Sequence, residues 1–101
     1  MRFKTGVKAY GVQPPTTLAM HVMDELFVRE TGDEMVVTSL MDGTHSPKSL
    51  HRFGLAFDFR THDIPQGSLG VILAEFRSKM PGWQVVIEPD HGHVEYDPTW
   101  G

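Results

Sequence analysis

Two short segments of the chain carry most of the side chains that could do chemistry. In the first segment, His51 is followed by Gly54, Ala56 and Asp58. The alternation of small or polar with large apolar residues over 54–60 predicts a strand with a large apolar face. The other face carries two small residues beside a carboxylate, and an imidazole precedes it. Open space beside a carboxylate is what a metal ion with a free coordination position requires.

The second segment lies near the carboxyl terminus. His91, His93 and Glu95 are spaced like residues on one face of a strand, so both imidazoles can reach one site. Glu88 and Asp90 bring further carboxylates to the start of this strand. Alone, such a His pair is a weak metal signal, because exposed Asp and His residues are common on protein surfaces.

Together the two segments contain the groups that metal-assisted hydrolysis needs. Catalytic zinc usually takes three protein ligands and keeps a fourth position for water. His51, Asp58 and one of His91 and His93 supply such a set, and a remaining carboxylate can act as base. The chain has no cysteine, which excludes disulfides and thiolate ligands. A zinc site would therefore use His and carboxylate ligands, which suit catalytic zinc.

One spaced pattern in the chain resembles the signature of a zinc peptidase family: Ser49-x-His51-x-x-Gly54-x-Ala56-x-Asp58, followed by His91-x-His93. The family comprises the zinc D-Ala-D-Ala carboxypeptidases and L-alanyl-D-glutamate endopeptidases of bacterial peptidoglycan. It shares its fold with the amino-terminal signalling domain of hedgehog proteins. The match covers roughly residues 35–96, and the two motifs together are more specific than either alone.

The resemblance implies particular roles for four residues. It implies that zinc (Zn2+) is the cofactor and that His51, Asp58 and His93 hold it. It also implies that His91 lies beside the metal and helps to stabilise the oxyanion of the reaction.

The general base in this family is a carboxylate shortly before the last zinc ligand, and two residues here could fill that role. Glu88 follows a β-branched run, as the base does in the hedgehog-like branch. Asp90 stands three residues before His93, as in another branch. We prefer Glu88 and keep Asp90 as the alternative.

The expected substrate is the peptide stem of peptidoglycan. Many relatives carry an Arg before the first motif that binds a substrate carboxylate, but the stretch 38–41 here has none. This argues against strict carboxypeptidase action. The chain looks like a compact, phage-type member without a separate wall-binding domain. The alternative is a catalytically inactive, zinc-bound binding module of the hedgehog kind, and the spare carboxylate favours the enzyme.

Length and charge set further limits. A chain of 101 residues predicts one domain over 1–101, near the small end of what folds on a single core. The net charge of -4 and the absence of a Lys/Arg stripe argue against nucleic acid as a partner. No apolar signal segment and no membrane-spanning run is visible. We expect a monomer made in the cytoplasm, without membrane association, that acts at the cell wall if released.

The elements that must position these residues can be read from periodicity. We expect a first helix that follows Pro14-Pro15, is capped by a Thr of Thr16-Thr17 and ends at Gly32, and a second helix capped by Ser68 and ended by Pro81-Gly82. We expect a short edge strand within 1–13 and further strands at 35–40, 54–60, 83–88 and 92–96. This order predicts an α+β fold: a small antiparallel sheet with the helices packed on one face and the zinc site on the sheet.

Overall fold

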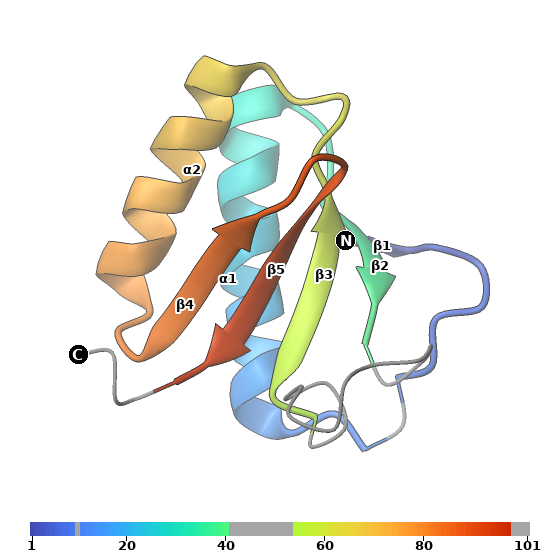
Figure 1. Ribbon diagram of the computed structural model, residues 1–101. Coiled ribbons are helices and arrows are strands. Elements are labelled where there is room, and N and C mark those ends of the chain that lie inside the picture. Colours follow the sequence, from blue (N-terminus) through green and yellow to red (C-terminus); the bar gives the residue numbers. More distant parts are fainter. Residues whose placement is uncertain (10, 41–53, 98–101) are drawn as a thin grey trace.

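The computed structural model describes residues 1–9, 11–40 and 54–97. Their helices and strands follow in the order β1 (Arg2–Phe3), α1 (Pro14–Thr31), β2 (Val36–Ser39), β3 (Ala56–Arg60), α2 (Gln66–Lys79), β4 (Trp83–Ile87) and β5 (His91–Tyr96). The strands form one sheet in the order β1-β2-β3-β5-β4, and both helices cover the same face of it (Figure 1). Only the β1–β2 pair is parallel within this sheet. The predicted α+β fold, including the short edge strand at the amino terminus, is confirmed.

The core fills the space between the helices and this face of the sheet. Phe57 and Phe59 of β3 and Val94 of β5 are fully buried there. From the helix side, Phe27 of α1 meets Phe59 edge to face, with ring centroids 5.5 Å apart. Because side chains alternate along a strand, burial of these apolar residues directs the intervening ones to the opposite face.

The helix ends differ from the prediction at their amino termini. Helix α1 begins at Pro14 after Gln13, and no side chain caps it. The predicted Thr cap is wrong, because the Thr16 hydroxyl is buried and donates a hydrogen bond to the Gly54 carbonyl at 2.6 Å. Helix α2 likewise begins after Pro65 without a side-chain cap, so Ser68 lies inside it rather than at its cap.

The carboxyl end of α1 matches the prediction. Gly32 adopts a left-handed conformation with φ of 79°, and its N–H donates to the Val28 carbonyl. Glycine adopts such a φ without the steric penalty of a Cβ atom. Neither helix within the described ranges is long and apolar enough to cross a membrane.

The strands are close to their predicted bounds, with one informative exception. Strand β3 begins at Ala56, whereas we expected it to begin at Gly54. Gly54 has a φ of +71°, outside the range of a strand, and sits in a turn instead. Strands β4 and β5 pair antiparallel, so Pro89-Asp90 forms the connection of a hairpin.

Candidate functional site

The pairing of β3 with β5 brings the two chemically interesting segments together. Asp58 is directly opposite His93 and Arg60 is opposite His91. Since Phe59, between Asp58 and Arg60, is buried under the helices, these four polar side chains lie on the other face of the sheet. The prediction that His91 and His93 share one strand face is confirmed.

The closest contact on this face joins Asp58 to His93. The Asp58 Oδ1 and His93 Nδ1 atoms are 2.8 Å apart, and both side chains are largely buried, with 14% and 22% of their areas exposed. The Nε2 atom of His93 lies 3.4 Å from Glu95 Oε1. The Asp58 hydrogen bond raises the pKa of His93 above its ordinary value of 6.5, against the opposing effect of partial burial, and the charges of Asp58 and Glu95 add to the rise.

His91 lies beside this pair and is oriented by its neighbour in the chain. Its Nδ1 atom is 2.6 Å from Asp90 Oδ1, and its Nε2 atom is 4.0 Å from Asp58 Oδ2. The hydrogen bond to His91 also lowers the pKa of Asp90. Asp90 is therefore an anion that keeps the far nitrogen of His91 directed toward Asp58.

The donor atoms of Asp58 and His93 suit a zinc ion. Imidazole nitrogen and carboxylate oxygen both bind zinc at about 2.0–2.2 Å, so two tetrahedral ligand atoms lie about 3.4 Å apart. The observed 2.8 Å would need only a small opening. The third expected ligand, His51, lies outside the described residues. Within those residues, no three His, Asp or Glu side chains are grouped so that they could hold a metal ion.

The two candidate bases differ in their surroundings. Glu88 follows β4 and is exposed, and its backbone N–H donates to the His91 carbonyl at 2.8 Å. Val86 is paired with His93. Glu88 stands two residues after Val86, so it is on the same face of the sheet as His93. Among the described residues the Glu88 carboxylate makes no ion pair, whereas Asp90 is bound to His91. This difference favours Glu88 as the group available to take a proton.

Gly54 has a different role from the one its spacing suggested. We expected it to clear space beside the Asp58 carboxylate, and this interpretation is wrong. A Cβ atom at Gly54 would stand 2.1 Å from the Gly11 carbonyl oxygen, on the side of the turn before α1. The Gly54 carbonyl also accepts from the Gln13 N–H at 3.1 Å. Gly54 therefore lets the segment before β3 pack against the start of α1.

Sequence reasoning missed part of the site. Ser39 of β2 is paired with Asp58 across an irregularity in the β2–β3 ladder. A cavity of about 340 Å³ lies beside Ser39 and Asp58. Its lining residues are Lys4, Thr38, Ser39, Asp58, Arg60, His62, Asp90 and His91. The position of Arg60 on this face could have been predicted from the alternation of side chains, because Arg60 stands two residues after Asp58 on the same strand. Nothing in the sequence signals Lys4, which comes from the far edge of the sheet.

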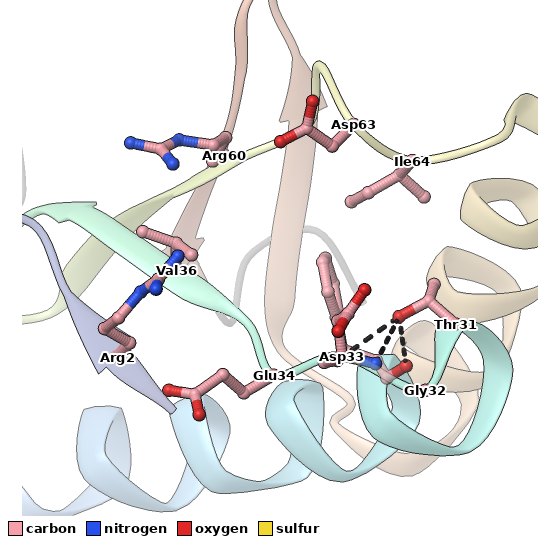
Figure 2. Close-up of a pocket in the computed structure, with 10 residues that line it drawn as sticks. Arg2, Thr31, Gly32, Asp33, Glu34, Val36, Arg60, Asp63 and Ile64 are labelled. Atoms are coloured by element: carbon pink, nitrogen blue, oxygen red, sulfur yellow. Dashed lines mark hydrogen bonds between the residues drawn. The ribbon is translucent and has the colours of Figure 1, made fainter.

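A second hollow of about 450 Å³ lies between the end of α1 and the loop after β3 (Figure 2). Thr31, Asp33 and Glu34 form one wall, and the Thr31 hydroxyl is hydrogen-bonded within its own turn to Phe27 and Asp33. Arg60 lines this hollow as well, but in Figure 2 its guanidinium extends away from Asp63. Arg60 therefore lines both hollows.

No family model, curated protein or solved structure matches the chain.

Proposed function

We propose that this chain is a zinc-dependent peptidase that hydrolyses peptide bonds in the stems of bacterial peptidoglycan. The observation that carries the proposal is the Asp58–His93 pair, which joins adjacent strands at 2.8 Å on the helix-free face of the sheet. His91 and the Glu95 carboxylate lie next to it, and Asp90 is bound to His91. A His–Asp pair alone is common in proteins, but here it joins the two segments whose spacing resembles the peptidase signature.

In this proposal His51, Asp58 and His93 hold the zinc ion. When bound, zinc lowers the pKa of its water to about 7 and polarises the substrate carbonyl. Partial burial of Asp58 and His93 reduces competition from solvent for these two ligands.

The remaining groups handle protons and charge. Glu88 takes the proton of the attacking water and delivers it to the leaving amine, with Asp90 as the alternative base. When both of its ring nitrogens carry a proton, His91 donates a hydrogen bond to the developing oxyanion through Nε2. Asp90, bound to Nδ1 of the same ring at 2.6 Å, fixes the orientation of that donor.

The test separates metal binding from turnover. We expect stoichiometric zinc in the purified protein, and we expect Asp58→Asn and His93→Gln to lose it. Glu88→Gln should keep zinc and lose at least about 100-fold in turnover of purified peptidoglycan, the scale expected for removal of a general base. Glu25→Gln, an exposed carboxylate on α1, is the matched control and should keep full activity. Full activity in both Glu88→Gln and Asp90→Asn would refute the mechanism.

The rival function is a zinc-bound binding module without catalysis. It predicts the same zinc content and the same loss in the Asp58 and His93 variants. It differs in predicting no release of peptides or amino acids from peptidoglycan by the zinc-loaded protein, together with retained binding to it. Sedimentation with insoluble peptidoglycan, measured beside turnover, therefore distinguishes the two.

A further inference from the structure

The cavity beside Asp58 is lined by charged side chains of both signs, and among the described residues only the anionic ones have a side-chain partner. Two of its lining side chains, Lys4 and Arg60, are cationic, and two, Asp58 and Asp90, are anionic. Each carboxylate is within hydrogen-bond distance of a histidine nitrogen, at 2.8 Å for Asp58 and 2.6 Å for Asp90.

The two cations have no such partners among the described residues. Neither the Arg60 guanidinium nor the Lys4 ammonium makes an ion pair or hydrogen bond with a described residue. An Arg on a strand next to several carboxylates usually finds one, because the planar guanidinium binds carboxylate with two parallel hydrogen bonds. Arg60 instead lines two hollows, with its donors available to a ligand.

We propose that Arg60, assisted by Lys4, binds a carboxylate of the substrate beside the reacting bond. The inference rests on the proposed peptidase function, because it takes Asp58 as the position of the reaction. Thr38 lines the same cavity and offers a hydroxyl group to the second oxygen of such a carboxylate.

The spacing on β3 limits where that carboxylate stands in the substrate. Two residues along a strand span about 6.8 Å, which separates the Asp58 and Arg60 backbone positions. An extended peptide advances about 3.3–3.6 Å per residue. The recognised carboxylate therefore lies within about two residues of the bond that is cut. It is either the carboxylate at the end of the peptide or the α-carboxylate of a glutamate linked through its side chain.

Three stem peptides distinguish these sources: one with both carboxylates, one amidated at the carboxyl terminus, and one amidated at the glutamate α-carboxylate. Wild-type kcat/KM should fall about 10- to 100-fold on only one of the two amidations, the value of a charge-assisted hydrogen-bond pair. Arg60→Gln should lower kcat/KM by the same factor on the unmodified peptide. It should cause no further loss on the amidated peptide that wild type cleaves less well. Lys4→Gln should cause a smaller loss, because lysine acts as a single exposed charge.

Two controls keep the outcome specific. Zinc content must stay equal to wild type in Arg60→Gln, and Arg77→Gln, an exposed cation on α2, should leave all rates unchanged. An equal loss on acid and amide peptides, or no loss at all, would overturn the assignment of Arg60.

A binding measurement separates this inference from failure of the proposed function. If the zinc-loaded protein cleaves none of the peptides, the peptidase proposal fails while the carboxylate site is still tested. The same three stem peptides are titrated into protein labelled with ¹⁵N at arginine. The Arg60 Nε resonance should shift with the unmodified peptide and with one of the two amides, and stay in place with the other amide. Identical responses to all three peptides would refute carboxylate binding at this position.

Discussion

Replacing Gly92 with Ala tests the packing that holds the two histidines of β5 in place. Gly92 is paired with Phe59 of β3 and faces the core, between His91 and His93. A Cβ atom at Gly92 would stand 2.3 Å from Phe59 Cζ and 2.5 Å from Cε1, whereas carbon atoms in good contact are about 3.5–4.0 Å apart. One of the two groups would have to move by more than about 1 Å.

The Phe59 ring has little room to move. It is fully buried and meets Phe27 edge to face, and the Phe57 ring centroid is 6.4 Å away on the same strand. Overpacking of this kind costs about 1–3 kcal/mol, and the confinement of the ring places Gly92→Ala near the upper end. In a domain of about 100 residues each kcal/mol lowers Tm by about 4–8 °C, so we expect a fall of about 12–24 °C.

Thermal unfolding followed by circular dichroism measures this effect. Gly67→Ala and Gly70→Ala are matched controls, because an added methyl group at either position in α2 meets nothing within 4 Å. These controls should hold or raise Tm, since Ala is favoured over Gly in a helix by about 0.5–1 kcal/mol. The smaller side chain of Phe59→Leu should recover part of the loss in a double variant. A Gly92→Ala protein that melts within a few degrees of wild type would refute the tight packing of Gly92 on Phe59.

Two further predictions concern pH and a buried hydroxyl. Because Asp58 raises the pKa of His93, their pair stabilises the zinc-free protein fully below the ordinary value of 6.5, and this contribution is lost as pH rises through the raised value. Tm of the zinc-free protein should fall as pH rises from 6.5 through the raised pKa of His93, and the fall should be smaller in Asp58→Asn. Zinc affinity should increase over the same pH range, because zinc binds neutral imidazole. Thr16→Val should lose about 1–2 kcal/mol in chemical denaturation by removing the bond to the Gly54 carbonyl, whereas Thr17→Val, at an exposed position, should lose less than about 0.5 kcal/mol. Equal losses in the two Thr variants would contradict the role given to the buried hydroxyl.

Much of the fold could be predicted because its signals are local. Alternation of side chains along 54–60 and 92–96 indicated strands, and the 3.6-residue spacing of apolar residues indicated the two helices. The same period of two placed His91 and His93 on one face without knowledge of any neighbouring strand. Gly32 could be predicted as a helix end because its backbone conformation is a property of the residue itself.

The predictions that failed depended on contacts between distant parts of the chain. Thr16 has the residue type and position of a cap, but its hydroxyl is used by the Gly54 carbonyl, 38 residues away in the sequence. Gly54 has the spacing of a strand residue, but its φ of +71° places it in a turn that packs closely against the Gly11 carbonyl. Neither contact leaves a periodic trace in the sequence, so residue type alone suggested the commoner local role.

The sequence by itself determined which side chains of each strand share a face, because that depends only on the alternation of the backbone. It did not determine which residues of one strand stand opposite which residues of another. Only the tertiary structure set Asp58 against His93, 35 residues apart, and Arg60 against His91. A slip of one residue would turn the polar side chains of one strand into the core, so burial of Phe57 and Phe59 is what holds this register. The part of His51 in the site stays a prediction from the sequence.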